Sequence, residues 1–150
     1  MSVGLHVDLS GLEALQGRID RLAGLDGSRT RALLEDIGEM VESQTRRRIQ
    51  EEKESPEGVD WPRLDPEYLA RKKKKSSGGL LVFGEGLLDS IDFEVSGDSV
   101  EVGSNLIYAA THQMGDEKRN IQARQYLGLS PENEGDVVDI VDKFIDGLLQ

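Results

Sequence analysis

The residue types best suited to catalysis or metal binding are scarce in this sequence. The 150-residue chain holds two histidines, His6 and His112, and no cysteine. A zinc site needs three or four nitrogen, sulfur or carboxylate ligands at suitable spacing, and two distant histidines do not provide this pattern. The Gly-x-Ser-x-Gly motif that presents a nucleophilic serine is also missing. We therefore expect no metal, no cofactor and no catalytic residue.

The spacing of Gly84 and Gly86 comes closest to that of a phosphate-binding loop. A P-loop requires Gly-x-x-x-x-Gly-Lys-Ser/Thr at the start of a helix, whereas Leu87 follows Gly86 here. Glu85 would in addition bring a negative charge towards the anion. These glycines therefore indicate a turn.

Two basic runs and the single tryptophan are the strongest candidates for a binding surface. Such runs could line a channel through which DNA passes, or they could bind an acidic neighbour. A basic run at the end of a helix is more often a solvated surface that favours the helix dipole. No aromatic residue is interleaved with either run, so base stacking is not expected. The candidate interface residues are Arg46, Arg47, Arg48, Trp61, Lys72, Lys73, Lys74 and Lys75.

The charge of the chain is divided unevenly between its halves. The formal net charge is -11, which argues against a general nucleic-acid binder. Residues 1–75 carry a net charge of -1 and residues 76–150 a net charge of -10. Such a chain can stack head to tail or meet a basic partner, because complementary fields favour encounter and register. The alternative is that the acidity only keeps the protein soluble.

The length of the chain predicts a single domain over residues 1–150. Its longest apolar run, residues 106–110, is far shorter than the roughly 20 residues that span a membrane. The N-terminus lacks a basic region followed by an apolar stretch, so no secretory signal is expected. We expect a soluble protein made inside the cell, with flexible segments at about residues 1–9, 54–60 and 75–80.

The hydrophobic periodicity predicts an α+β fold with a small antiparallel sheet. Gly97-Asp98 separates two alternating segments, which predicts a hairpin near residues 91–103. Ser130 begins a C-terminal helix, and the apolar stripe of residues 29–52 predicts one long helix near the N-terminus. The other predicted elements are helices at 10–23, 65–74 and 107–113 and short strands at 80–83 and 121–127.

Four sequence patterns together resemble the virion-morphogenesis or tail-completion proteins of Mu-like tailed bacteriophages. The resemblance extends over residues 29–149, whereas residues 1–28 match only in being helical. The family often has proline where this chain has Gln122, and phenylalanine where Met114 and Tyr126 stand. The patterns are SPEGVDWPRL at 55–64, GEGLLDSI at 84–91, VGSNLIYAATHQMG at 102–115 and QARQYLGLS at 122–130.

The resemblance implies a structural protein that acts in tail completion or at the head–tail neck and joins tail to head. It implies a homo-oligomer, with a ring expected, and contacts with other neck, tail or head proteins. DNA in the channel would lie nearby without specific recognition, and no membrane is involved. The protein would be assembled in the cytoplasm of the host bacterium and would reside in the virion.

The contact between subunits can be predicted from charge. A ring contact joins one face of a subunit to a different face of the next. We expect the basic stretch 46–75 of one copy to meet the acidic 85–146 surface of the next copy or of a partner.

Three alternatives stay open at this point. The chain could be a tail terminator or a capsid-assembly factor of the same particle. A small acidic regulatory binding protein, even a nucleic-acid mimic, is the alternative from another class. A carboxylate hydrolase is a third alternative, which would need a pocket with perturbed acids.

Overall fold

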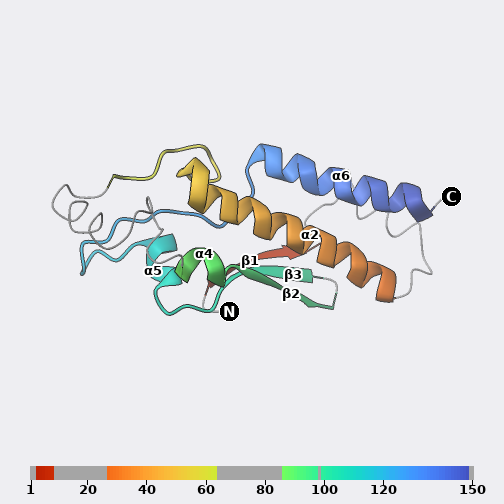
Figure 1. Ribbon diagram of the computed structural model, residues 1–150, viewed down its shortest axis with the longest axis horizontal. Coiled ribbons are helices and arrows are strands. Elements are labelled where there is room, and N and C mark those ends of the chain that lie inside the picture. The colour runs from red at the N-terminus through yellow and green to blue at the C-terminus, as the bar shows by residue number, and fades with distance from the viewer. Residues whose placement is uncertain (1–2, 9–26, 64–85, 98, 149–150) are drawn as a thin grey trace.

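The computed structural model describes residues 3–8, 27–63, 86–97 and 99–148 of the chain. The described elements form an α+β fold in which helices pack on one face of a small sheet (Figure 1). In chain order they are β1 (Val3–Asp8), α2 (Gly27–Arg47), the π-helical turn η2 (Arg48–Glu52), α4 (Gly86–Ser90), β2 (Asp92–Ser96), β3 (Ser99–Ser104), α5 (Ala109–Met114) and α6 (Pro131–Leu148).

The sheet has three antiparallel strands in the order β1-β3-β2. The predicted hairpin is confirmed, since β2 pairs with β3 from Asp92↔Gly103 to Ser96↔Ser99. Gly97 closes it with a φ of 59°, a backbone conformation that glycine adopts at low cost. Among the described strands, β1 and β2 are the two outer ones.

Strand β1 lies where the sequence predicts a flexible segment. It pairs with β3 from Val3↔Ser104 to Asp8↔Ser99. Its alternation of Val3, Leu5 and Val7 covers only three apolar positions, a weak signal of period two. The pairing partner lies far along the chain, so the local sequence does not reveal it.

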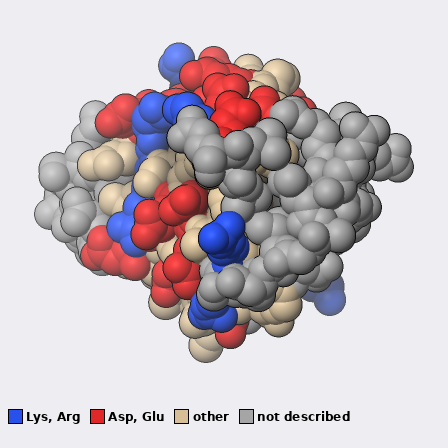
Figure 2. Space-filling view, turned by 90° about the vertical axis from the view of Figure 1, so that its right-hand side faces the viewer, with Lys and Arg blue, Asp and Glu red and all other residues tan. Residues whose placement is uncertain are grey.

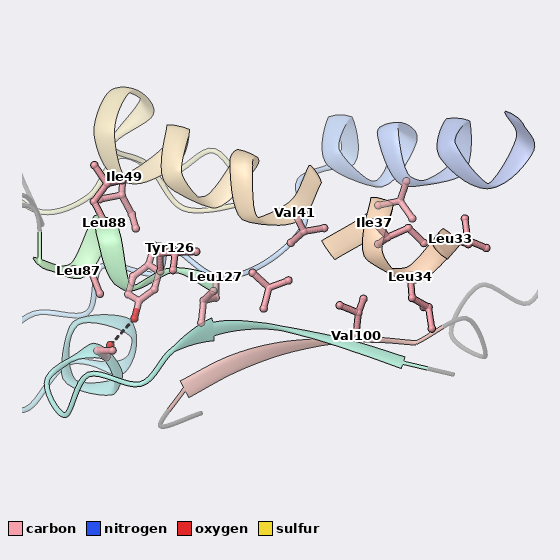
Figure 3. Close-up of a cluster of buried hydrophobic side chains, with 14 of the residues drawn as sticks. Leu33, Leu34, Ile37, Val41, Ile49, Leu87, Leu88, Val100, Tyr126 and Leu127 are labelled. Carbon is pink, nitrogen blue, oxygen red and sulfur yellow. Dashed lines mark hydrogen bonds between the residues drawn. The ribbon is translucent and has the colours of Figure 1, made fainter. Parts of the chain in front are cut away.

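Helix α2 lies between the sheet and α6, so that the described part of the molecule has three layers (Figure 1). An added Cβ at Gly38 would lie 2.5 Å from Phe93 Cδ2, which shows how closely the helix approaches β2. The buried side chains between these layers form one core, and Figure 3 shows part of it. Its fully buried members include Leu33, Leu34, Ile37, Val41, Ile49, Ile91, Val100, Val102, Tyr126, Val137 and Val141.

The C-terminal helix α6 and the short helix α5 are confirmed close to their predicted positions. The Ser130 hydroxyl accepts a hydrogen bond from the Asn133 amide at 3.0 Å, which caps the start of α6. Gly115 ends α5 with a φ of 77°, as the sequence predicts. Within the described residues, no helix is long and apolar enough to cross a membrane.

One local prediction is corrected by the structure. Residues 121–127 form no strand, and only the isolated bridge between Asp116 and Ile121 involves this segment. The short helix α4 was not predicted and begins at Gly86, the last residue of the predicted turn, whose first two residues lie outside the described part of the chain. The predicted helices 10–23 and 65–74, the strand 80–83 and the flexible stretch 75–80 lie outside the described residues.

Candidate functional site

The three arginines at the C-terminal end of α2 have different surroundings. Arg46 donates from Nη2 to the carbonyl oxygen of Ile91 at 2.8 Å and forms an ion pair with Glu42 at 2.9 Å. Arg47 is exposed and pairs with Glu52 at 3.3 Å. Arg48 is 2% exposed and therefore lies inside the folded chain. The run is thus not one continuous basic surface.

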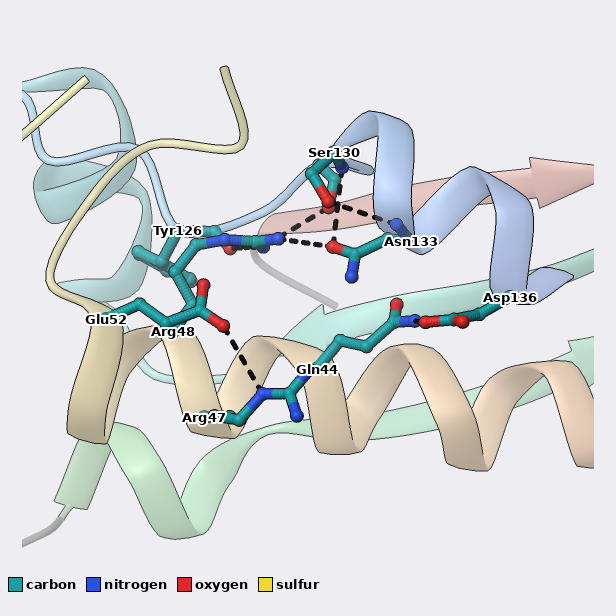
Figure 4. A network of polar contacts seen from close by, with 9 residues as sticks. Gln44, Arg47, Arg48, Glu52, Tyr126, Ser130, Asn133 and Asp136 are labelled. Atoms are coloured by element: carbon teal, nitrogen blue, oxygen red, sulfur yellow. Dashed lines mark hydrogen bonds and ion pairs between the residues drawn. The ribbon is translucent and has the colours of Figure 1, made fainter. Parts of the chain in front are cut away.

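The buried guanidinium of Arg48 binds two acceptors in the segment that leads into α6 and one in the first turn of that helix (Figure 4). Its Nη1 donates to the Tyr126 carbonyl at 2.7 Å and to the Gly128 carbonyl at 3.2 Å. Its Nη2 donates to Asn133 Oδ1 at 2.6 Å. Arg48 therefore joins the end of the long helix to the start of α6.

Burial has an electrostatic cost at this position. Desolvation lowers the pKa of Arg48 from its ordinary value, while the negative charges of Glu52, Glu57 and Glu54 act in the opposite direction. An arginine stays charged at neutral pH even with such a shift. Charge-assisted hydrogen bonds to carbonyl and amide oxygens are the interactions that offset the loss of hydration.

The π-helical turn η2 shapes the chain directly after α2. It ends at Lys53, which has a φ of 57° and whose amide donates to the Arg48 carbonyl at 2.9 Å. Residues 54–60 then form a hydrogen-bonded turn, in which the Ser55 amide donates to the Val59 carbonyl at 2.8 Å. The mobility that the sequence predicts for residues 54–60 stays a prediction.

Trp61 fixes this turn to the segment before α6. The side chain is 5% exposed, and its Nε1 donates to the Gln125 carbonyl at 2.9 Å. Arg124 is also buried and donates from Nε to the Pro62 carbonyl at 2.9 Å. The structure thus brings together two of the four sequence patterns, those at residues 55–64 and 122–130.

A third pattern joins the same place through α5. Gln113 Oε1 accepts from the backbone amides of Tyr126 and Leu127, both at 3.0 Å. The Tyr126 hydroxyl donates to the Ala109 carbonyl at 2.7 Å (Figure 3). We call the residues that make these contacts the junction, defined as Arg48, Trp61, Gln113, Arg124 and Tyr126.

The surface beside the junction is partly apolar. Ile107 is 94% exposed and Met114 69% exposed. The ring of Tyr108 lies edge-on to His112, with 5.8 Å between the ring centroids. The exposed Tyr108 thus differs from Gln113 and Arg124, whose side chains form hydrogen bonds within the chain.

The second basic run, Lys72–Lys75, lies outside the described residues. A role of Arg46, Arg47, Trp61 and these lysines in an interface stays a prediction. The described part of the basic stretch also carries acidic residues, among them Glu51, Glu52 and Glu54. Within the described chain, no three His, Asp or Glu residues are grouped so that they could hold a metal ion.

The Arg119–Asp116 pair stabilises the exposed turn beyond α5. Arg119 Nε lies 2.7 Å from Asp116 Oδ2, and this hydrogen bond lowers the pKa of the Asp116 carboxyl below its ordinary value. The pair is exposed to solvent, so its contribution to stability is small.

Removing the Tyr126 hydroxyl tests the junction. We expect Tyr126→Phe to lower the free energy of unfolding at pH 7 by about 1 kcal/mol, because the buried Ala109 carbonyl loses its donor. Burial also raises the pKa of the Tyr126 phenol. An unfolded tyrosine ionises near pH ~10, so stability falls above that pH by up to about 1.4 kcal/mol per pH unit. Urea unfolding at several pH values should show a shallower alkaline fall in the Phe variant.

The fold and the junction define an α+β domain in which residues from three of the four sequence patterns are joined by internal packing and hydrogen bonds. The sequence matches the phage virion morphogenesis family over residues 10–146, and the chain belongs to that family. The expected resemblance is thereby confirmed, and the coarse role that the family implies is phage morphogenesis.

Individual relatives come from a phage, a prophage and an archaeon. The putative capsid assembly protein G of Escherichia phage Mu is 25% identical over the full length of this chain and 99% of its own. The Mu-like prophage FluMu G protein 2 of Haemophilus influenzae is 34% identical over 53% of this chain and 62% of its own length. An uncharacterized protein of Methanocaldococcus jannaschii is 33% identical over 58% of this chain and 69% of its own length. No solved structure matches the chain.

Proposed function

We propose that this chain is a structural component of a phage particle that acts in tail completion or at the head–tail neck. In this role it assembles with copies of itself as a ring, contacts other neck, tail or head proteins and catalyses no reaction. The observation that carries the proposal is membership of the virion morphogenesis family over residues 10–146. The protein then resides in the virion and is assembled in the host cytoplasm.

The arrangement of the described residues supports a structural role. The junction uses its arginines, its glutamine and both of its aromatic side chains for contacts within the chain. These contacts hold α2, α5 and the start of α6 in a fixed relation, which suits a subunit that must present the same surfaces in every copy of an assembly.

A capsid-assembly role is the second candidate function. It is favoured by the name of the phage Mu relative, a putative capsid assembly protein that aligns over this whole chain. The two roles differ in the particle that forms when the protein is missing.

Deleting the gene from the phage that encodes this chain separates these roles. If the protein completes tails or joins them to heads, lysates should contain DNA-filled heads and separate tails, and electron microscopy should show few joined particles. If it acts in capsid assembly, closed heads should be missing. Supplying the intact gene in trans is the control, and normal infectious particles in its absence would contradict both roles.

A further inference from the structure

A pocket of about 270 Å³ lies between the turn that follows η2 and the first turn of α6. Residues from both segments line it, and Arg48 belongs to the lining although its side chain is buried. Figure 4 shows Arg48, Glu52, Ser130 and Asn133 at this place. The pocket therefore lies where the junction joins the end of the long helix to α6.

Most of the charges around this pocket are negative. Its charged lining residues are four glutamates and one arginine, which gives a formal net charge of -3. Glu52 pairs with Arg47 at 3.3 Å, whereas Glu54, Glu57 and Glu132 form no ion pair within the described chain. Three carboxylates without an ion-pair partner therefore line one concave space.

Arg48 is the common neighbour of these carboxylates. Burial lowers its pKa, and the charges of Glu52, Glu57 and Glu54 act in the opposite direction, which places all three carboxylates near one guanidinium. The buried Nε of Arg48 has no hydrogen-bond partner among the described residues. A buried donor without an acceptor is costly. A ligand that also brought an oxygen to Arg48 would therefore be favoured.

A basic peptide segment satisfies both features, whereas a single metal ion does not. No three His, Asp or Glu residues of the described chain are grouped so that they could hold a metal ion. A bare ion would also bring no acceptor for the Arg48 Nε. An extended segment can instead direct several cationic side chains to separate carboxylates, and its backbone carbonyls are acceptors for a guanidinium.

The sequence contains one basic run that the described contacts do not account for. In the first run, Arg46 and Arg47 form ion pairs with neighbouring glutamates, and Arg48 is buried. The second run, residues 71–75, consists of five adjacent basic residues and is the longest in the chain. It lies outside the described residues, so its sequence alone enters the argument.

We propose that the pocket between η2 and α6 of one copy binds residues 71–75 of a second copy. Lysines of the run pair with Glu54, Glu57 and Glu132, and a backbone carbonyl of the run accepts from the Arg48 Nε. This contact joins two different surfaces, so repetition builds a ring or a filament rather than a closed pair. The inference rests on the self-assembly in the proposed function and assigns one interface to it.

Acidity alone does not distinguish the pocket from the rest of the surface. Figure 2 looks onto the end of the molecule where α2 begins and the β2–β3 hairpin closes. On the described part of this face, Asp and Glu form patches that smaller groups of Lys and Arg interrupt (Figure 2). Exposed charges of this kind contribute little to a contact. The pocket differs because its carboxylates line a concave space together with a buried guanidinium.

Neutralising each side of the contact in a separate protein tests this assignment. The pocket variant is Glu54→Gln/Glu57→Gln/Glu132→Gln, and the run variant has Gln in place of each of Lys72–Lys75. Sedimentation velocity at low salt should show wild-type oligomers that dissociate as salt is added. Each variant alone should associate with a dissociation constant raised at least about tenfold.

A mixture of the two variants shows whether the contact joins different copies. The run of the pocket variant can still enter the pocket of the run variant, whereas the reverse contact lacks charges on both sides. An equimolar mixture should therefore form pairs and nothing larger, under conditions in which neither variant associates alone.

The matched control is Asp89→Asn/Asp139→Asn/Asp146→Asn, which removes three negative charges at exposed positions outside the pocket. It should assemble like the wild type. The pocket variant should stay folded, because the side chains of its three glutamates form no hydrogen bond or ion pair within the described chain. Circular dichroism should confirm this.

A peptide with the sequence of residues 70–77 gives a second measurement, in which the pocket is unchanged. The run variant keeps an intact pocket and lacks the competing lysines, so it should bind this peptide. The NMR signal of the Arg48 Nε–H should shift as the peptide is added. The signal of Arg31, which pairs with Glu35 near the other end of α2, should not move. A peptide with Gln in place of the four lysines should not bind.

A pocket variant that assembles like the wild type, or a mixture that forms no pairs, would overturn the inference. Peptide binding without pairs would place the run in the pocket of its own chain and would also overturn it. So would equal peptide binding to a chain that carries both sets of changes. A monomeric wild-type protein would overturn this contact together with the self-assembly in the proposed function. The role in the particle is tested separately, since it fails if particles form normally without the gene.

Discussion

Replacing Arg48 with methionine should lower the free energy of unfolding by about 3 kcal/mol, whereas the same change at Arg47 should alter it by less than about 0.5 kcal/mol. Arg48 is buried and donates to the Tyr126 and Gly128 carbonyls and to Asn133. Methionine retains much of the apolar stem but leaves all three acceptors without this donor.

Two opposing effects decide how far Arg48→Met lowers the free energy of unfolding. Removing a buried charge eliminates its desolvation cost, and replacing a whole buried polar network by apolar residues is often neutral. Here two acceptors are backbone carbonyls that a side-chain substitution cannot remove. Each buried acceptor that loses its partner costs about 1–3 kcal/mol. The cost of the lost hydrogen bonds should therefore exceed the desolvation cost that is removed with the charge.

Arg47 is the matched control because it differs from Arg48 only in position and environment. It is exposed, and its pair with Glu52 is a surface ion pair of small value. Urea unfolding followed by circular dichroism compares the two variants directly. Equal stability of Arg47→Met and Arg48→Met would show that Arg48 does not hold the junction.

The spacing of residues along α2 predicts that Arg48 lies on the buried face of the helix, although its charge suggests an exposed position. Position 48 lies seven residues after Val41 and therefore on the same face of the helix. A run of three arginines indicates a solvated helix end, and charge alone gives no reason to separate Arg48 from its two neighbours. The acceptors lie about 80 residues away along the chain, so no local pattern reveals them.

The hairpin and α6 could be predicted because their determinants are local. Gly97 supplies the turn between two alternating segments, and the Ser130 hydroxyl caps the helix that follows. Residues 121–127 show a similar alternation of Ile121, Ala123, Gln125 and Leu127, which explains the incorrect strand. There the amides of Tyr126 and Leu127 bond to the Gln113 side chain rather than to a neighbouring strand.

The candidate interface could be predicted from sequence only as a set of residue types. Arg46, Arg47 and Arg48 are adjacent in sequence but have three different environments, and Trp61 packs in the core.

Trp61→Ala should lower the free energy of unfolding by about 3 kcal/mol, because it removes the largest side chain of the 54–63 segment from the core. The indole also donates to the Gln125 carbonyl, and this acceptor would lose its partner. Circular dichroism is the suitable probe for urea unfolding, since the variant lacks the chain's single tryptophan.

Two further substitutions separate the contributions of Trp61. Trp61→Phe retains most of the buried area but loses the hydrogen bond to Gln125, so it should cost about 1–2 kcal/mol. Val59→Ala in the same turn should cost less than about 0.5 kcal/mol, since Val59 is 66% exposed. A partner-binding role predicts a different result: Trp61→Ala would then unfold at the wild-type urea concentration and would lose only self-association in sedimentation velocity. Unchanged stability would therefore move Trp61 from the junction to an interface between proteins.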